Sequence, residues 1–328
     1  EDFLLSGGRF TRRRFAGGEQ TFAGVFVSHD RALLGALRGS AALRFDGWAL
    51  RDGHRRELDI TTQLPTRNDR FADLDGSAVS PRLGLTLPLA SGLRARSAVY
   101  QAFRVPTLNE FHRPFRVGNV NTDANPGLRD ETVTGLEAGF DLRRGAWHLA
   151  GTVFHHALED AIANVTLSRT PTLISRQRRN LDAVRVRGLE WSARWAPVPA
   201  FSVFIDVLWN DARVREAREQ PSLTGQRLAQ VPRHTVTGGF TWNAPANVTV
   251  EVRARHAGAQ FEDDEATLRL APATVADVQV SRPLSARLDG FFAIENLADA
   301  RVETGRSADG LVTYDAPRRV RVGVKARW

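Results

Sequence analysis

Apolar residues recur at every second position along much of the chain. Between residues 201 and 209 every odd-numbered position is apolar, whereas Ser202 and Asp206 occupy the other parity. The same alternation runs through the segments 83–89, 136–142, 248–255 and 320–328. Because successive side chains of a strand point to opposite faces, this pattern predicts long strands that each have one apolar face. Within 184–195 the apolar parity changes at Gly188, which predicts a glycine bulge. No convincing helical segment competes with the strands.

The connections between these strands alternate in length. Compact segments rich in Pro, Gly, Asn or small residues lie at 88–92, 143–146, 196–200, 243–247 and 283–287. Long connections separate them at roughly 105–130, 161–180, 214–230, 260–272 and 298–317. In a meander this alternation places every long loop at one end of the sheet. Short turns at one end and long loops at the other are typical of outer-membrane barrels, with the long loops outside the cell.

The strand count predicts an all-β fold, a transmembrane antiparallel up-and-down β-barrel. Further strands near 1–8, 20–29, 38–50 and 79–88 bring the total to about 14, with the first beginning and the last ending on the short-turn side. Closure of a barrel would remove the edge that the alternating final strand otherwise presents. A β-propeller is disfavoured because no blade signature recurs, and a soluble sandwich would not confine long loops to every second connection.

Composition narrows the classes of protein further. The chain has no cysteine and no methionine, and it opens without an apolar leader, so we expect it to be a piece of a longer protein. No apolar run is long enough for a transmembrane helix. The net charge of +8 comes almost wholly from arginine. An arginine-rich genome or a preference for anions would explain this excess, and no nucleic-acid-binding motif accompanies it, so no nucleic-acid partner is expected.

The stretch QAFRVPTLNEF at 101–111 closes one strand and opens a long loop. Pro106 ends strand pairing because it has no N–H, and Thr107 and Asn109 are suited to turn the chain through side-chain bonds to the backbone. It is followed in order by five further phrases: NPGLRDETVTGLEAGF, RNLDAVRVRGLEW, QVPRHTVTGGF, IENLADARVET and APRRVRVGVKARW.

This ordered series resembles the C-terminal barrel of TonB-dependent outer-membrane receptors, the transporters of ferric siderophores, haem and cobalamin. The resemblance runs from about Asp46 to the end and is most specific from Phe103 onward. One departure is that Asp130 stands where the family usually has a proline before Glu131. The residues that carry the resemblance are Phe103, Arg104, Pro106, Thr107, Asn109, Glu110, Asn125, Pro126, Glu131, Glu137, Gly188, Glu190, Glu295, Asn296, Pro317 and Arg318.

The end of the chain matches the family's assembly signal. Members end in an aromatic residue that the barrel-assembly machinery reads, and Trp328 occupies that position after the alternating residues Val320, Val322 and Val324. Trp328 is expected in the aromatic girdle at the periplasmic interface, with the valines facing lipid.

The resemblance also implies what this chain lacks. Such receptors have an N-terminal plug inside a barrel of about 22 strands. Residues 1–328 therefore read as a partial barrel of about 14 strands, without the plug, and coupling to a TonB-type energy complex would depend on the missing N-terminal part. The expected function is active uptake of a scarce metal chelate across the outer membrane of a Gram-negative bacterium, in contact with membrane lipid and lipopolysaccharide. The alternative is a plugless, passive 14-stranded porin that favours anions, which bilayer conductance would distinguish.

Two clusters suggest other chemistry without supporting it. In HHALED, His155 and His156 are adjacent on a strand and so point to opposite faces, which prevents joint chelation without a bulge. The loop FEDDE, residues 261–265, could hold Ca²⁺ loosely, but a solvated run of charges is favoured. No nucleophile motif or phosphate loop is present, so no enzyme activity, cofactor or metal site is expected.

Ligand contacts in a receptor of this kind are expected in the long loops and at their bases. The loop from Pro106 to Arg129 concentrates cations and amides that suit an anionic chelate. The candidate ligand-binding residues are His112, Arg113, Arg116, Asn119 and Asn121.

Overall fold

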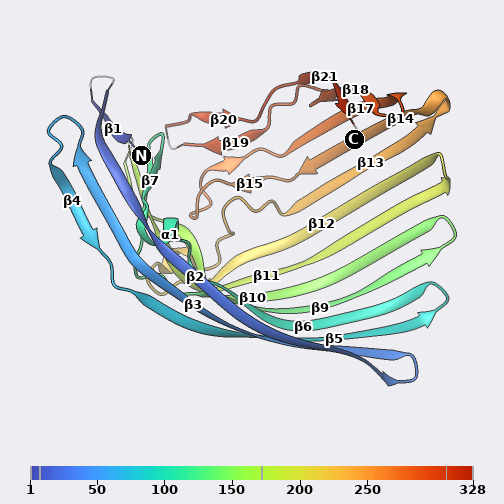
Figure 1. Ribbon diagram of the computed structural model, residues 1–328, viewed down its shortest axis with the longest axis horizontal. Helices are drawn as coiled ribbons and strands as arrows, with labels where there is room; N and C mark the ends of the chain where they lie inside the picture. Colours follow the sequence, from blue (N-terminus) through green and yellow to red (C-terminus); the bar gives the residue numbers. More distant parts are fainter. Residues whose placement is uncertain (1, 7–8, 171–172, 308, 327–328) are drawn as a thin grey trace.

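A computed structural model of the chain describes residues 2–6, 9–170, 173–307 and 309–326, and its main feature is one wide, curved antiparallel sheet (Figure 1). The sheet has 17 strands, three of which (β4, β7 and β8) are short additions at its loop end. The others pair in chain order: β1 (Asp2–Ser6), β2 (Arg9–Leu34), β3 (Leu37–Asp59), β5 (Leu74–Ala90), β6 (Leu93–Arg104), β9 (Glu131–Arg144), β10 (Trp147–Arg169), β11 (Ile174–Val198), β12 (Phe201–Glu216), β13 (His234–Ala244), β14 (Val248–Ala257), β17 (Ala273–Ser285), β18 (Leu288–Glu295) and β21 (Arg319–Ala326). The predicted meander of about 14 strands is confirmed.

The remaining elements are short and lie in the long connections. They are β4 (Pro65–Arg70), α1 (Leu108–His112), β7 (Phe115–Val117), β8 (Val120–Asp123), η1 (Pro221–Leu223), β15 (Gln260–Phe261), β16 (Arg269–Leu270), β19 (Glu303–Arg306) and β20 (Val312–Tyr314), with η2 (Pro245–Asn247) in a short turn. A helix as short as α1 has too few turns to produce a periodic signal, which is why the sequence pattern did not predict it.

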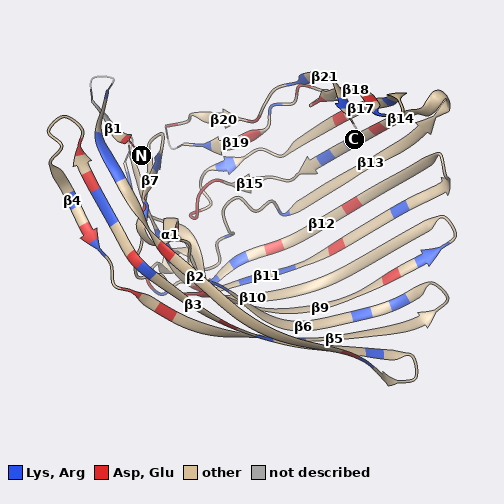
Figure 2. Ribbon diagram, in the orientation of Figure 1, with Lys and Arg blue, Asp and Glu red and all other residues tan. Residues whose placement is uncertain are grey.

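Short turns gather at the right of Figure 1 and long connections at its left, as the alternation of lengths predicted. Several strands extend further than expected. The segment 161–180 was predicted to be a loop, but β10 and β11 remain paired as far as Arg169 and Ile174. β2 begins at Arg9 rather than near residue 20. These extensions mix apolar residues with polar and charged ones, and Figure 2 shows charged residues along the loop ends of β2 and β3, so the simple alternation fades there.

The prediction that the first strand begins on the short-turn side is wrong. In β1, Phe3 pairs with Arg12 and Asp2 with Arg13, at the long-loop end of β2. The other end of β2 reaches the short turn, where Leu34 pairs with Leu37. Five residues are too few to cross a bilayer in a tilted strand, which needs about 9–11.

The predicted bulge at Gly188 is also absent. Gly188 pairs with Phe154 on one side and Asn210 on the other, and the register is continuous through its neighbours. The apolar parity changes there because Val184 joins a loop-covered core, whereas Leu189 faces outward with 42% of its area exposed. A glycine is required at this position for steric reasons instead, since a Cβ on residue 188 would overlap the Trp209 carbonyl and the Phe154 ring.

One face of the sheet, here called the outer face, carries a band of exposed apolar side chains. They include Phe45, Val79, Leu85, Leu136, Val153, Leu189, Ile205, Trp242, Phe292 and Val322. Such a band is what a barrel presents to lipid. Within the described residues no pairing joins β21 to β1 or β2, so these strands form the two edges of the sheet. No helix in the described residues has the length and apolar character needed to cross a membrane.

The buried cores lie at the loop end, on the inner face. One cluster joins Leu50 of β3, Phe111 of α1 and Leu128. The other groups Ala161, Val165, Leu181, Val184, Val214, Ala217 and Leu223 from the β10–β11 extension and the loop after β12. The long connections are therefore packed structures, and they fix the positions of polar residues above the barrel.

Candidate functional site

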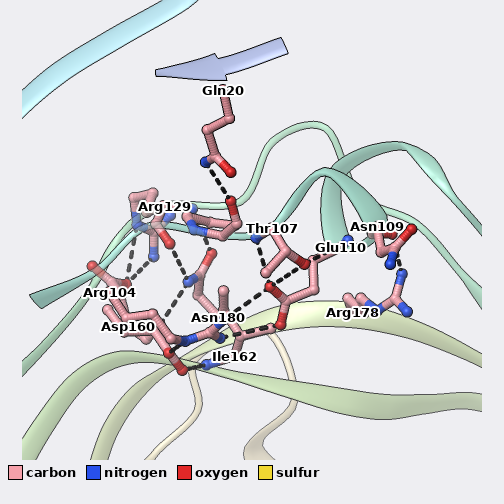
Figure 3. Close-up of polar contacts among 12 residues, drawn as sticks. Gln20, Arg104, Thr107, Asn109, Glu110, Arg129, Asp160, Ile162, Arg178 and Asn180 are labelled. Atoms are coloured by element: carbon pink, nitrogen blue, oxygen red, sulfur yellow. Dashed lines mark hydrogen bonds and ion pairs between the residues drawn. The ribbon is translucent and has the colours of Figure 1, made fainter. Parts of the chain in front are cut away.

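The residues of VPTLNEF form a capped helical turn rather than an irregular loop (Figure 3). Thr107 is the N-cap of α1, and its Oγ1 accepts a hydrogen bond from the Glu110 N–H at 3.3 Å. In return, Glu110 Oε2 accepts from the Thr107 N–H at 2.7 Å. This reciprocal capping box satisfies two backbone donors that a helix start otherwise leaves free. The prediction that Thr107 turns the chain by bonding to backbone is confirmed.

Arg104 ties this turn to the neighbouring strands. Its guanidinium donates to Glu110 Oε2 at 2.8 Å and to Oε1 at 3.1 Å, and it also pairs with Glu131 of β9. Glu131 in turn accepts from the backbone N–H of Ile162 in β10. Burial by itself would raise the pKa of Glu110, but the bonds from Arg104 and Thr107 outweigh it and lower that pKa. These residues thus join four elements in one charged network.

Two further side chains hold α1 and the segment directly before it. Gln20 of β2 donates to the Pro106 carbonyl at 3.0 Å, and Arg178 of β11 donates to the carbonyls of Asn109 and Arg113. Burial lowers the pKa of Arg178. Arg178 therefore fixes the C-terminal end of α1 to β11.

The NPGLRD phrase folds as a turn on the inner face. Asn125 Oδ1 accepts from the Gly127 N–H at 2.9 Å, and Asn125 Nδ2 donates to the Arg178 carbonyl at 3.0 Å. Asp130, the residue that departs from the family pattern, accepts from the Trp48 indole N–H at 3.0 Å, and burial raises its pKa. A carboxylate is thus accommodated because β3 supplies a donor.

Asn296 organises the loop after β18. Its Oδ1 accepts from the Ala300 N–H at 2.8 Å, and its Nδ2 donates to the carbonyls of Ala300 and Ala316. The backbone of Asn296 is left-handed with φ 51°, which Asn tolerates better than most residues. This side chain therefore closes the turn that leads towards β21.

The other motif residues serve the strands or turns. Glu137 accepts from the Tyr100 hydroxyl at 2.7 Å, Glu295 pairs with Arg319 at 3.1 Å, and the Arg318 N–H donates to Asp299 at 2.8 Å. Phe103 pairs with Thr132, Glu190 pairs with Thr152 and Leu208 in the ladder, and Pro126 and Pro317 are exposed. The motif residues thus form the framework, and the ligand site must be sought elsewhere.

A cavity of about 890 Å³ lies among the long connections. Its walls come from the β7–β8 hairpin, the start of β11, the loops after β12 and β14, and the β19–β20 hairpin. The parallel pairing of β8 with β11 builds one wall, because it sets Thr122 beside Arg176, and the Ile174 N–H donates to the Asn119 carbonyl at 2.8 Å. The volume lies in the range of about 300–1,000 Å³ that ligand pockets usually have.

Arg176 is the most distinctive group in the cavity wall. Only 7% of Arg176 is exposed, and within the described residues its Nε and Nη2 have no hydrogen-bond partner. The side-chain Nδ2 and Oδ1 of Asn119 and the Nε of Arg306, all buried atoms of lining residues, also lack partners there. Burying a guanidinium whose nitrogens lack hydrogen-bond partners costs free energy, on the order of several kcal/mol, so acceptor oxygens placed at this wall would be stabilising.

The acidic residues of the wall are mostly engaged. Asp264 accepts from the N–H and hydroxyl of Thr166 at 2.8 and 2.6 Å. Glu262 accepts from Gln230 at 3.2 Å. Burial raises the pKa of Glu262, although the Gln230 hydrogen bond and the charge of Arg176 oppose that shift. The unpartnered groups of the wall are therefore mainly N–H donors, whereas the carboxylates of Asp264 and Glu262 already accept hydrogen bonds.

The structure separates the five loop residues predicted to bind ligand. Asn119 lines the cavity. His112 has 1% of its area exposed and stacks on Phe71 with ring centroids 4.5 Å apart. The Arg113 carbonyl accepts from Arg178, Arg116 donates to the Gly118 carbonyl at 2.9 Å, and Asn121 donates to Asp123 at 3.4 Å.

The sequence analysis missed Arg176 and Arg306, and it included Glu262 only as part of the FEDDE run. Arg176 lies in ISRQRRN, where arginines alternate with other polar residues and nothing marks one as buried. Only the parallel addition of β8 to β11, a contact between distant segments, distinguishes it.

The two clusters with suggestive chemistry have structural roles. His155 is exposed on the outer face, whereas His156 bonds Tyr100 on the inner face at 3.1 Å, so the two point apart as predicted. The interpretation of FEDDE as a solvated run is wrong for Asp263, which is 0% exposed and accepts from the Leu268 N–H at 2.7 Å. A buried carboxylate that receives several backbone donors holds its loop closed.

The final strand has the expected outward valines. Val320, Val322 and Val324 are exposed and pair with Ile294, Phe292 and Gly290 of β18. Trp328 lies outside the described residues, so its place in the girdle stays a prediction.

The sheet is curved and antiparallel and carries an apolar band on its outer face. Short turns lie at one end and a polar cavity lies among the loops at the other. These features together define an outer-membrane barrel of the receptor type. The chain matches the family of TonB dependent receptor-like β-barrels over residues 3–297, and it belongs to that family. It is therefore a protein of the Gram-negative outer membrane, in a family of transporters and receptors.

Individual relatives are distant. The ferrienterobactin receptor of Escherichia coli (strain K12) is 20% identical over 270 residues, which cover 74% of this chain and 35% of that protein. The ferric yersiniabactin uptake receptor FyuA from Yersinia pestis has 15% identity and a TM-score of 0.75, covering 98% of this chain and 48% of that one. The copper transporter OprC gives 15% identity, a TM-score of 0.73, and coverage of 95% and 48%. The chain thus spans about a third to a half of the length of these relatives.

Proposed function

We propose that this chain is the C-terminal barrel segment of an energy-coupled outer-membrane receptor that takes up an anionic metal chelate. Residues 1–328 would form part of the barrel, and an upstream segment would supply the plug and the remaining strands between the edges at β21 and β1. That segment would also carry the contact with a TonB-type energy complex. The chain covers about half of the length of each of the two solved relatives, which supports this arrangement.

One observation carries the proposal: Arg176 is buried beside a cavity of about 890 Å³ with two guanidinium nitrogens unpartnered among the described residues. A carboxylate, phenolate or catecholate oxygen of a chelate would satisfy those nitrogens. Asn119, one of the loop residues expected to bind ligand, and Arg306 would add donors. Arg113, Arg116 and Asn121 from the same loop stay candidates for the rim, whereas the fifth candidate, His112, is buried against Phe71 and would act only by supporting the loop.

Replacement of the central arginine tests this role. Arg176→Gln keeps most of the side-chain volume and removes the charge, and we expect affinity for the cognate chelate to fall roughly tenfold to a hundredfold. The probes are ferric enterobactin, ferric yersiniabactin and ferric citrate, measured by binding to native outer membranes that contain the protein. The control is Arg194→Gln, which changes an exposed inner-face arginine that pairs with Asp206 at 3.3 Å, away from the cavity.

Unchanged binding in Arg176→Gln, with a chelate that the parent protein binds, would remove this arginine from the site. The double replacement Arg113→Ala and Arg116→Ala separates the rim from the cavity wall. If only the double variant lost affinity, the loop residues rather than Arg176 would form the site.

The passive porin is the competing function. It requires 14 strands to close on themselves, whereas the pairings of the described residues leave β21 and β1 as edges. We expect the native protein to be nearly silent in planar bilayers, and open channels of steady conductance would favour the porin.

Uptake by either route needs no covalent catalysis, so the chain is not expected to be an enzyme. Assembly by the barrel-assembly machinery and contact with lipopolysaccharide belong to this proposal as well.

A further inference from the structure

Three polar side chains converge on the inner face of the sheet, where β6, β9 and β10 lie side by side (Figure 1). The hydroxyl of Tyr100 donates to Glu137 Oε1 at 2.7 Å and lies 3.1 Å from His156 Nε2. The same Oε1 and Nε2 atoms are 3.7 Å apart. A phenol oxygen, a carboxylate oxygen and an imidazole nitrogen therefore surround one point. We call these three residues the inner triad.

The pairing of the strands explains why these atoms meet. Gly135 of β9 pairs with Tyr100 on one side and with His156 on the other. A Cβ on Gly135 would overlap the phenol ring, so the glycine lets Tyr100 reach across β9 to His156. Glu137 lies two residues further along β9 and so points to the same face. The Phe154 ring stacks on the imidazole with centroids 5.0 Å apart, which holds the orientation of His156.

The three atoms have the spacing of ligands on one metal ion. Donor atoms that each bind an ion at about 2.0–2.2 Å lie about 2.8–3.6 Å from one another in octahedral or tetrahedral geometry. The separations of 2.7, 3.1 and 3.7 Å in the inner triad closely match that range. The side chains of Glu137 and His156 are 28% and 27% exposed, so an ion can reach them.

The inner triad differs from the usual metal-binding clusters because one of its donors is a phenol. Among the described residues, no group of three or more His, Cys, Asp or Glu side chains is placed to hold a metal ion. Tyrosine oxygen becomes a strong ligand only after it loses its proton, and metal binding drives that loss. The hydrogen bonds that now join the three groups are those expected of such a site without its ion.

We propose that the inner triad binds a ferric ion. Phenolate and carboxylate oxygens are hard, anionic donors that suit a trivalent ion, whereas Mg²⁺ and Ca²⁺ prefer oxygen ligands throughout and would gain little from the imidazole. On binding, the phenol proton leaves to water and the ion takes its place between the three donors. Two negative charges and one neutral imidazole then face the ion, and water or a weak chelator fills its remaining positions.

The inner triad is separate from the chelate cavity. Ile162, which lines the cavity, follows His156 by six residues along β10, so it lies about 20 Å further towards the loops. The two sites also have opposite chemistry, because the cavity wall offers N–H donors to an anion and the triad offers acceptor atoms to a cation. The inference depends neither on Arg176 nor on which chelate the cavity takes.

The test uses the native protein, purified from outer membranes in mild detergent and titrated with ferric nitrilotriacetate. A phenolate on Fe³⁺ gives a visible charge-transfer band that neither a carboxylate nor an imidazole produces, so the band reports Tyr100 itself. Tyr100→Phe keeps the ring beside Gly135 and removes the donor oxygen. Its matched control is Tyr314→Phe, because Tyr314 is the other tyrosine of the chain and is exposed in β20.

We expect the parent and Tyr314→Phe to show the band, and Tyr100→Phe to lose it and to bind iron roughly tenfold or more weakly. A parent without the band, or a band that persists in Tyr100→Phe, would overturn the proposal. Binding of Zn²⁺ or Cu²⁺ to the triad in preference to Fe³⁺ would overturn the assignment of the ion.

The second donor gives an independent comparison if Tyr100→Phe does not fold. His156→Gln should weaken the band and the binding of iron, whereas His155→Gln should change neither, since His155 is exposed on the outer face. Equal bands in these two variants would count against the triad. Arg176→Gln should leave the band unchanged, so failure of the ferric site is distinct from failure of the proposed chelate uptake.

Discussion

The guanidinium of Arg104 donates two hydrogen bonds, of 2.8 and 3.1 Å, to the carboxylate of Glu110, and these bonds connect the end of β6 to the helical turn that follows it. The same carboxylate caps α1 through Thr107. This residue pair therefore fixes the helical turn to the end of a strand, and Phe111 of that turn packs against Leu50 and Leu128.

Loss of this pair should loosen the loop end of the barrel. In Arg104→Gln the carboxylates of Glu110 and Glu131 lose their shared cation, and we expect a loss of about 1–2 kcal/mol in unfolding free energy, moderate because Arg104 is partly exposed. Urea unfolding in detergent measures it. The control is Arg94→Gln, in the same strand, which removes a longer pair of 3.4 Å with Asp141. Equal losses in the two variants would contradict a special role for Arg104.

Chelate binding should strengthen as the pH falls, through Glu262. Burial raises the pKa of this carboxyl above its ordinary 4.5, so it takes up a proton at a higher pH than an exposed glutamate would. Acidification through that raised pKa removes a negative charge from the cavity wall and favours an anionic ligand. Glu262→Gln should bind more tightly near neutral pH and lose this dependence, as titration of binding against pH would show. Glu219→Gln, at an exposed residue paired with Arg179, should keep it.

His112 should make stability sensitive to mild acid. Burial lowers its pKa from 6.5, and the nearby His54 adds to the shift. The unfolded chain therefore takes up a proton near pH 6.5 while the folded protein does not, so stability is present above that pH and declines below it.

His112→Phe keeps an aromatic ring against Phe71 and removes the titration. The fall in unfolding midpoint between about pH 7.5 and about pH 5.5 should be smaller in this variant than in the parent. His29→Gln, at an exposed position of β2, serves as the control. A pH dependence in His112→Phe as steep as that of the parent would show that other groups cause it.

Gly188 should tolerate no side chain. A methyl group there would overlap the backbone carbonyl of Trp209 and the Phe154 ring, and a backbone oxygen in a paired strand cannot move aside cheaply. We expect Gly188→Ala to cost about 1–3 kcal/mol and to lower the heat-modifiable, folded fraction on unboiled gels. Gly47→Ala is the matched control, since Gly47 also lies within a strand but a Cβ there would meet nothing within 4 Å. Normal folding of Gly188→Ala would contradict this explanation of the glycine.

Distance in the sequence explains which expectations held. The alternation of residues 201–209 and the turns at 88–92 and 143–146 are local signals, and the strands and hairpins that they predicted are present. The parity change at Gly188 is local too, but it was misread because the covering of Val184 comes from Leu223, far along the chain. The burial of Asp263 has the same kind of cause, since Arg169 of β10 reaches it at 3.1 Å.

The sequence by itself determined that the chain forms a meander of long strands with one lipid-facing side, because side-chain parity within a strand follows from the backbone alone. The ordered phrases also determined the family. Only the tertiary structure decided which of the 45 lysines and arginines form candidate binding sites. An arginine becomes a candidate when segments that are distant in the sequence bury it or bring other arginines close to it. The pairing of β8 with β11 helps to bury Arg176, and the pairing of β11 with β12 gathers Arg185, Arg187 and Arg213 around the carboxylate of Asp211. Burial and charge balance are properties of such contacts, and no single stretch of sequence contains them.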